Sequence, residues 1–423
     1  MKETYRKAVL ENGARVVAET IDSVRSISIG VWIDVGSRDE AADEAGASHF
    51  IEHMVFKGTK KRSAQDIAAS LESVGGSLNA FTGREHTCYF ARTLDEHVDV
   101  ALDVLSDLIR NPLFNPNHLE KERQVIISEI KEMEDSPADL VHDLLMETIW
   151  KTSPLGRPVI GSTQSVLGLS RGKLLGFMRR NYAFPRMVIA ASGSLKHQVL
   201  LSKIQRKFGF DSRHSGGPKI QAAPRAGKSR RVVTKKTAQT HISMGAPAFP
   251  YKDPRRYSAL VLSNILGGGM SSRLFQRIRE KLGLAYSVYS FFDFFEDTGV
   301  FGIYMGTDRE NAPRVIGEVL KEIKRLRRNS IDPEELSNAK YQLKGNLLLS
   351  MESTFNRMNR LARYELFLRE NVDLDHTIKA INKIKSKDVI EVAEELFSPG
   401  RLSAVALGQL DRNALNGIDW DSF

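Results

Sequence analysis

Hydrophobic and polar residues follow two spacings along this chain of 423 residues, and each spacing predicts a different kind of element. Short apolar runs bounded by turn residues predict strands, whereas apolar residues three or four positions apart predict amphipathic helices. An Asn12-Gly13 pair between two apolar segments predicts a hairpin at the N-terminus. In the first half, the pattern predicts strands at 26–33, 77–81 and 87–93 and helices at 47–56, 94–110 and 117–134.

The second half repeats this order of elements. Thr93-Leu94-Asp95-Glu96 and Thr307-Asp308-Arg309-Glu310 mark the same junction of strand and helix in the two halves, as an internal duplication would leave them. Because strands and helices do not strictly alternate, we expect an α+β fold with two structurally related domains, each an antiparallel or mixed sheet flanked by helices. The predicted strands of the second half are 241–245, 285–291 and 299–306, and its predicted helices are 254–266, a segment ending at Arg279, and 311–326.

The length of the chain calls for more than one hydrophobic core. Glycine and proline interrupt the periodic pattern near its middle, as in Gly216-Gly217-Pro218. We therefore expect an N-terminal domain at 1–212, a linker at 213–230 and a C-terminal domain at 231–423.

Composition narrows the class of protein. With 41% hydrophobic and 27% charged residues, the chain is typical of globular proteins rather than disordered or membrane-embedded ones. No apolar run approaches the roughly 20 residues that cross a bilayer, and the charged N-terminus lacks a signal-peptide pattern, so we expect a cytoplasmic protein without membrane insertion. Cys88 is the single cysteine, which excludes an intrachain disulfide and a cysteine-rich zinc site.

The net charge of +9 is spread over short clusters rather than gathered in one stripe. The cluster at 324–328 has apolar residues at helical spacing, so it fits a solvated helix face. Nucleic-acid binding would need a concentrated basic surface or a known motif, and we expect none.

The strongest chemical signal is His49-Phe50-Ile51-Glu52-His53 within a predicted helix. Residues four apart share a helix face, so His49 and His53 can direct both imidazoles at one metal ion, while Glu52 lies beside that face, within reach of a water molecule. Zinc suits such a set, because an open coordination position activates water and a nearby carboxylate can take its proton. Two ordinary helix histidines, or a closed structural zinc site, are the alternatives.

A third ligand is expected from the predicted helix at 117–134. Glu122 and Glu129 are seven residues apart and share a face with apolar residues between them. Two carboxylates on an apolar stripe are unfavourable unless a metal ion compensates. Periodicity alone leaves open whether this is simply a glutamate-rich helix.

Together these residues resemble the pitrilysin or insulinase family of zinc peptidases. The resemblance rests on the His-x-x-Glu-His spacing and on Glu129, which lies 76 residues after His53. It runs through most of the chain and is greatest to bacterial relatives of the mitochondrial processing peptidase β subunit. The family implies one zinc ion per chain bound by His49, His53 and Glu129, with Glu52 as the general base and Glu122 as a second acidic residue that supports the site.

Two further segments resemble the family's substrate-binding parts. The strand containing Asn79, Ala80 and Phe81 resembles a sheet edge that takes a peptide as an added strand, and a normal internal strand is the alternative. In the second half, Arg279 and Tyr286 resemble residues that reach the substrate carbonyl or the developing oxyanion, with a surface arginine and a packed tyrosine as the alternative.

The resemblance also implies an assembly. Larger family members enclose the substrate between two halves, so a two-domain chain is expected to form a homodimer whose subunits share the active site. We expect a zinc endopeptidase that cleaves unfolded peptides or presequence-like segments inside that chamber. The alternatives are a non-catalytic core subunit of the same fold and one subunit of a heterodimeric peptidase.

Overall fold

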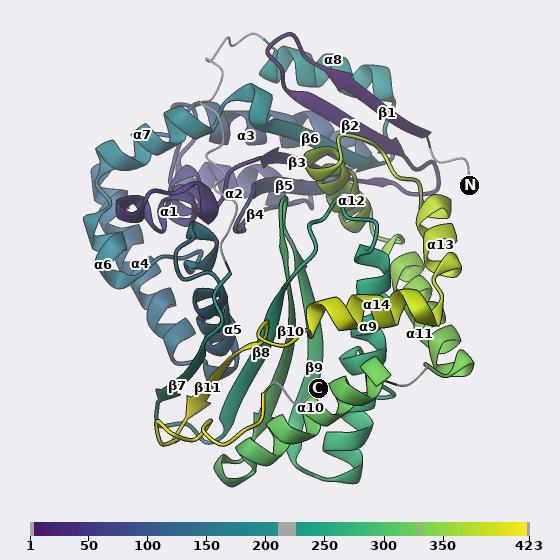
Figure 1. Cartoon of the computed structure of the whole chain (residues 1–423). Helices are drawn as coiled ribbons and strands as arrows, with labels where there is room; N and C mark the ends of the chain where they lie inside the picture. The colour runs from purple at the N-terminus through teal and green to yellow at the C-terminus, as the bar shows by residue number, and fades with distance from the viewer. Residues whose placement is uncertain (1–3, 210–225, 329–330, 421–423) are drawn as a thin grey trace. The chain divides into compact units, whose positions relative to one another are not determined.

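The computed structural model describes residues 4–209, 226–328 and 331–420, which form two compact units (Figure 1). Residues 213–225 of the predicted linker lie outside the described residues, so the division that the linker marks stays a prediction. Contacts between residues divide the chain into these two units, and each unit consists of three stretches of chain. Unit 1 is Met1–Lys131, Arg157–Gln221 and Leu349–Asn371, and unit 2 is Glu132–Gly156, Ala222–Leu348 and Val372–Phe423.

Unit 1 is built on a mixed six-stranded sheet in the order β1-β2-β6-β3-β5-β4. Only the β2–β6 pair is parallel. The central strands β3 and β6 are buried almost throughout, whereas β4 is an edge strand with exposed residues. The strands are β1 (Thr4–Val9), β2 (Arg15–Thr20), β3 (Ser26–Ile33), β4 (Ser77–Thr82), β5 (Thr87–Leu94) and β6 (Met187–Gly193).

Helices cover both faces of this sheet. On one face, α12 (Thr354–Phe367) packs Met358 and Leu361 against Trp32 and Val188. On the other face, Tyr89 of β5 lies against Phe56 and Tyr182. The remaining helices of unit 1 are α1 (Ala47–Val55), α2 (Ala64–Glu72), α3 (Val98–Arg110), α4 (Pro116–Glu134, up to Lys131), α6 (Thr163–Gly168), α7 (Arg171–Asn181) and α8 (His197–Phe208).

Unit 2 is built on a five-stranded mixed sheet in the order β7-β11-β8-β10-β9, with only the β7–β11 pair parallel. Numbered along the chain, its strands lie in the order 1-5-2-4-3, and strands β2 to β6 of unit 1 lie in the same order. The predicted pair of related domains is confirmed by this shared topology. The strands are β7 (Arg230–Thr234), β8 (Thr240–Ala248), β9 (Ala285–Phe294), β10 (Gly299–Thr307) and β11 (Ser403–Gly408).

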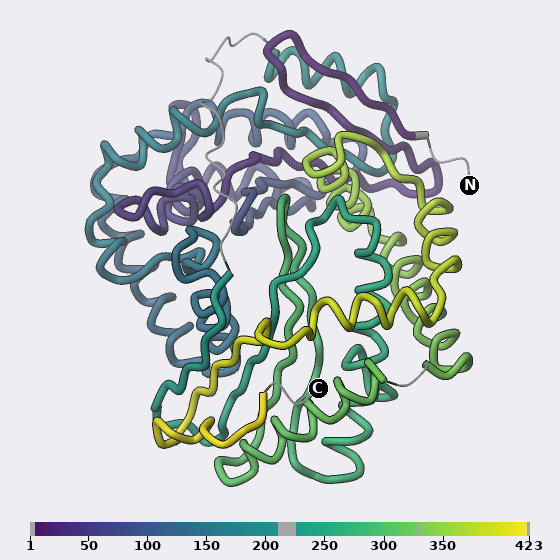
Figure 2. The backbone as a smooth tube through the Cα atoms, viewed as in Figure 1, coloured from purple at the N-terminus to yellow at the C-terminus, as the bar shows by residue number. Residues whose placement is uncertain are grey.

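Each unit takes one covering helix from the other half of the chain. The face of the unit 2 sheet that carries Val300 and Val405 is covered by α5 (Pro137–Ile149), whose Val141 and Leu145 pack against it. In unit 1, the helix from the distant segment is α12. Figure 2 follows both crossings along the backbone. The remaining helices of unit 2 are α9 (Arg256–Gly267), a π-helix (Phe275–Lys281), α10 (Ala312–Arg328), α11 (Pro333–Ser350, up to Leu348), α13 (Leu374–Lys383) and α14 (Ser386–Leu396).

Most predicted elements are found within a few residues of their expected bounds. The predicted strand at 26–33 is β3, and the predicted helix at 117–134 is α4 with one more residue at its start. The segment ending at Arg279 differs, because it is wound as a π-helix. Among the residues that the structure describes, no helix is long and apolar enough to cross a bilayer.

Candidate metal centre

Helix α1 is held at its start by a buried carboxylate. Glu40 accepts hydrogen bonds from the backbone N–H groups of Gly46 (2.8 Å) and Ser48 (2.7 Å), which are unsatisfied within the helix. Gly46 has φ of 92°, a conformation that favours glycine, and a Cβ there would lie 2.8 Å from the Ile160 carbonyl oxygen. Burial raises the pKa of Glu40 to about 8 despite these hydrogen bonds. The first turn of α1, directly before His49, is therefore fixed by its surroundings.

The two histidines of α1 lie side by side, one turn apart. Their ring centroids are 4.7 Å apart. Apolar residues on the buried side of the helix, among them Phe50 and Met54, anchor it, so the imidazoles are left on the half-buried side. Burial, with the nearby His53, lowers the pKa of His49 to about 4, which keeps that imidazole neutral at physiological pH. A neutral imidazole is the form that binds a metal ion.

Helix α4 brings Glu129 to the same place. One carboxylate oxygen of Glu129 lies 3.8 Å from Nε2 of His49 and 3.5 Å from Nε2 of His53. One ligand atom from each of the three residues falls within 4.8 Å of the others, and all three side chains are half-buried. No other cluster of this kind occurs in the described part of the chain. Two imidazoles and one carboxylate are a donor set that zinc accepts, with a position left open for water or substrate.

Glu122 lies behind this cluster rather than in it. Its Oε2 is 3.2 Å from Nδ1 of His53, and its Oε1 is 2.9 Å from Nζ of Lys57. If Nδ1 donates to Glu122, then Nε2 of His53 keeps its lone pair facing Glu129. A carboxylate in this place orients the imidazole and increases its basicity toward a metal ion. Lys57, which no sequence pattern indicates, balances the charge of the buried Glu122.

Glu52 reaches from α1 to strand β4. Its carboxylate accepts a hydrogen bond from the hydroxyl of Thr82, the last residue of β4. Burial raises the pKa of the Glu52 carboxyl, and the hydroxyl of Thr82 opposes that rise. Glu52 is therefore held by Thr82 while it lies close enough to His53 and Glu129 for their charges to affect its pKa. The sequence gives no direct signal for Thr82, because the contact joins residues 30 positions apart.

The predicted substrate strand, β4, is one of the two edge strands of the unit 1 sheet. Asn79 is exposed, and its side-chain oxygen accepts a hydrogen bond of 2.8 Å from the N–H of Ala80. The Phe81 side chain lies on the face of the sheet opposite to that of Ala80, and its ring centroid lies 5.3 Å from that of Trp32 beneath α12. All three residues belong to the edge strand β4, and the half-buried Phe81 ring packs against the core cluster beneath α12.

Arg279 and Tyr286 lie together in unit 2. The guanidinium of Arg279 is 5.5 Å from the centroid of the Tyr286 ring and 4.7 Å from that of Phe275. Tyr286 is 70% exposed. Arg279 lies in a π-helix, and π-helical turns are frequent at functional sites.

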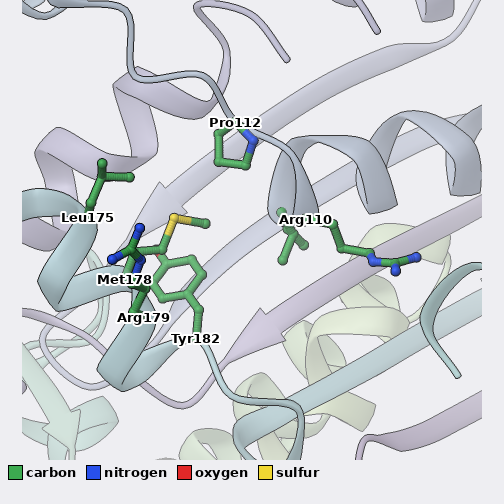
Figure 3. A pocket seen from close by; sticks show the side chains of 7 residues that line it. Arg110, Pro112, Leu175, Met178, Arg179 and Tyr182 are labelled. Carbon is green, nitrogen blue, oxygen red and sulfur yellow. The ribbon is translucent and has the colours of Figure 1, made fainter. Parts of the chain in front are cut away.

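The cavities of unit 1 include two that lie outside the cluster. One, of about 420 Å³, is lined by residues of α3, α7 and their flanks (Figure 3). Two of its polar groups are engaged elsewhere, since Arg110 donates to the Lys207 carbonyl and the Tyr182 hydroxyl bonds that of Tyr89. The other, of about 330 Å³, lies beside the end of α1 and the start of β4 and is lined by Phe56, Lys57, Ala64, Ile67, Ala68, Glu72, Gly76, Ser77 and Leu78.

The chain is similar to known proteins both by family and by individual relatives. A family model described as Insulinase (Peptidase family M16) matches residues 15–163, and one described as Peptidase M16 inactive domain matches residues 168–343. The chain is 39% identical over 393 residues to a zinc protease of Bacillus subtilis, covering 93% of this chain and 96% of that protein. It is 40% identical over 410 residues to a zinc protease of Mycobacterium tuberculosis, covering 95% and 93%.

Solved structures of similar fold were also found. A protease from Helicobacter pylori superposes with a TM-score of 0.91 at 22% identity, covering 96% of this chain and 99% of that one. A structure of a peptidase M16 inactive domain from Pseudomonas fluorescens gives a TM-score of 0.88 at 20% identity, covering 96% and 98%. At these identities the likeness shows a shared fold.

Proposed function

Because this chain belongs to the insulinase family of zinc proteases, peptidase family M16, we propose that it hydrolyses peptide bonds with one zinc ion held by His49, His53 and Glu129. The observation that carries this assignment of ligands is the convergence of three donor atoms from two separate helices within 4.8 Å. A carboxylate oxygen that lies near both Nε2 atoms is the arrangement that a shared zinc ion requires.

Each residue of the site has a separate task in this proposal. When bound, zinc supplies a Lewis acid that polarises a carbonyl group and lowers the pKa of water. Glu52 takes the proton of the attacking water and then delivers it to the leaving amine, which a carboxylate fixed beside the metal ligands is placed to do. Glu122 holds His53 in the tautomer that binds metal.

The substrate we propose is an unfolded peptide or a presequence-like segment, bound as an added strand on the free edge of β4. Backbone hydrogen bonds with Ala80 would give affinity with little demand on sequence. The cavity of about 330 Å³ beside the start of β4 would take one substrate side chain, and its Phe56 and Ile67 favour an apolar one.

We further propose that two copies of the chain form a homodimer that encloses the substrate. Arg279 and Tyr286 of one subunit would then serve the zinc site of the other. The exposure of Tyr286 and its contact with Arg279 support this idea, because together they present a cation and a hydroxyl suited to an oxyanion. Larger members of the family enclose the substrate between two halves, and a second copy of this two-unit chain would supply the second half.

The test compares the wild-type chain with Glu52→Gln on a library of unstructured fluorogenic peptides. We expect zinc to copurify with both proteins, and the wild type to lose hydrolysis in 1,10-phenanthroline and regain it when zinc is restored. Glu52→Gln should bind zinc normally and lose about 10²-fold to 10⁴-fold in kcat, because general-base catalysis contributes about that factor.

The matched control is Glu132→Gln, which changes an exposed glutamate of α4 and should leave kcat unchanged. Full hydrolysis by the zinc-free wild type, or by Glu52→Gln, would contradict the mechanism. A wild type that binds zinc and cleaves no peptide would favour the non-catalytic core subunit.

A further inference from the structure

Thr82 touches the site through two different groups. Its hydroxyl donates a hydrogen bond to the Glu52 carboxylate, and its backbone ends the strand β4 at the free edge of the unit 1 sheet. We propose that Thr82 is a positioning residue that holds the general base in place and links it to the strand on which the substrate is bound. This role rests on the proposed function of Glu52.

The backbone of Thr82 faces the free edge. In an antiparallel pair, alternate residues direct their N–H and C=O groups toward the neighbouring strand. The N–H of Gly83 donates to the His86 carbonyl at 2.8 Å, so Phe81 and Asn79 share its orientation toward β5. Thr82 and Ala80 therefore point outward.

A second contact supports this orientation. The N–H of Ala80 donates a hydrogen bond to the side-chain oxygen of Asn79, as expected of an N–H that points away from β5. A substrate strand would replace that local bond and would pair with the outward groups of Ala80 and Thr82. The same residue would then hold the substrate through its backbone and the base through its side chain.

The side chain of Thr82 suits the task. Threonine is branched at Cβ, which restricts rotation about χ1, and residue 82 is fixed opposite Thr87 in the β4–β5 pair. Thr87 is itself buried, and its hydroxyl donates to the Val35 carbonyl at 2.9 Å. The hydroxyl of Thr82 is thus held by a rigid part of the sheet, and Glu52, which is half-buried, is held by that hydroxyl.

Without this donor, the Glu52 carboxylate would lose its partner and could rotate. A half-buried carboxylate pays a desolvation cost that a hydrogen bond offsets, so the free side chain would move toward solvent or toward other donors. Fewer molecules would then hold the base beside the attacking water. Zinc binding and the backbone edge would be unaffected, because neither depends on the hydroxyl.

The test compares Thr82→Val, which has the same shape without a hydroxyl, with Thr82→Ser, which retains it. We expect Thr82→Val to lose about 10-fold to 100-fold in kcat, since small misplacements of a catalytic group cost about this much. Its KM should change by less than about 3-fold and its zinc affinity should be unchanged. Thr82→Ser should keep kcat within about 3-fold of the wild type. The control is Thr234→Val, which removes a threonine hydrogen bond in unit 2, to Leu410.

A double variant separates positioning of the base from a general structural effect. If Thr82 acts through Glu52, then Thr82→Val should cause no further loss of kcat in the Glu52→Gln background. If Thr82→Val unfolds, Thr82→Ala removes the same donor without the added methyl group, and the same loss of kcat is expected.

Wild-type kcat in both hydroxyl-free variants would overturn the role of Thr82, and so would an equal loss in Thr82→Ser. Either result would leave the zinc peptidase standing as long as the wild type requires zinc and Glu52. A wild type that cleaves no peptide would remove the proposed function, and the role of Thr82 would fall with it.

Discussion

Units 1 and 2 share a strand order but differ in what their corresponding helices carry. After β3, unit 1 continues to α1 with His49, Glu52 and His53, whereas after β8 unit 2 continues to α9, which contains no histidine, aspartate or glutamate. Both helices bury an apolar face against their sheets. The fold therefore depends on the buried apolar face of each helix. The chemistry depends on a few residues of the other face, and the fold is kept whether these are metal ligands, as in α1, or not, as in α9.

The acidic helices differ in the same way. Helix α4, which follows α3, directs Glu129 at two histidines of α1. Helix α11, which follows α10, directs Glu335 at Arg273, with two hydrogen bonds of 2.7 and 2.6 Å. One carboxylate is placed to bind a metal ion, and the other is already satisfied by a cation of its own unit.

The largest effect is expected when a proposed metal ligand is removed from α1, because unit 1 should then lose the chemistry that distinguishes it from unit 2. His53→Ala should weaken zinc binding by on the order of 10³-fold and reduce hydrolysis to background, because one of three protein ligands is lost. The measurements are zinc content after dialysis and competition with a chromophoric chelator. The exposed His376 of unit 2 provides the control, and His376→Ala should change neither quantity. Equal zinc binding by His53→Ala and the wild type would place the metal elsewhere.

A smaller effect is expected from the residue behind the cluster. Glu122→Gln keeps an acceptor for Nδ1 of His53 but loses the charge that pairs with Lys57. Zinc affinity should fall by about 10-fold, the lower end of the effect of residues that orient metal ligands. Competition titration measures it, and Glu120→Gln, which changes an exposed glutamate on the same helix, should match the wild type. Unchanged affinity in Glu122→Gln would show that Glu122 does not orient His53.

Local patterns predicted the elements that carry the candidate site. The helix containing His49 and His53 and the helix containing Glu129 were expected within one residue of their bounds, because apolar periodicity is strong in both. The pairing of the two helices came from family resemblance, since periodicity left Glu129 undecided. The contacts of Lys57 and Thr82 join elements far apart in the chain, and no single stretch of sequence encodes them.

Local patterns also could not predict that α5, from the first half of the chain, covers the sheet of unit 2, or that α12, from the second half, covers the sheet of unit 1. Both are ordinary amphipathic helices, and an apolar face does not indicate which of two sheets it will cover. The predicted substrate-binding residues include Phe81, whose ring packs against Trp32. Side chains alternate between the two faces of a strand, so the Phe81 ring lies on the opposite face from the side chains of Ala80 and Thr82. The π-helical winding of Phe275–Lys281 was not predicted, because helical periodicity does not distinguish a π-helix from an α-helix.

The smallest predicted effect tests whether the acidic helix of unit 2 serves structure alone. Arg273 and Glu335 are 19% and 29% exposed, and their paired hydrogen bonds should contribute about 1 kcal/mol to the stability of unit 2. Glu335→Gln should therefore lower the midpoint of thermal unfolding by about 2 °C while zinc content and kcat stay at wild-type values. Glu129→Gln should do the reverse, with zinc lost and little change in the stability of the metal-free chain, because no lysine or arginine of the described residues pairs with that carboxylate. If Glu335→Gln also reduced zinc binding, the two carboxylates would not have separate tasks, and the division of structure and chemistry between the units would be wrong.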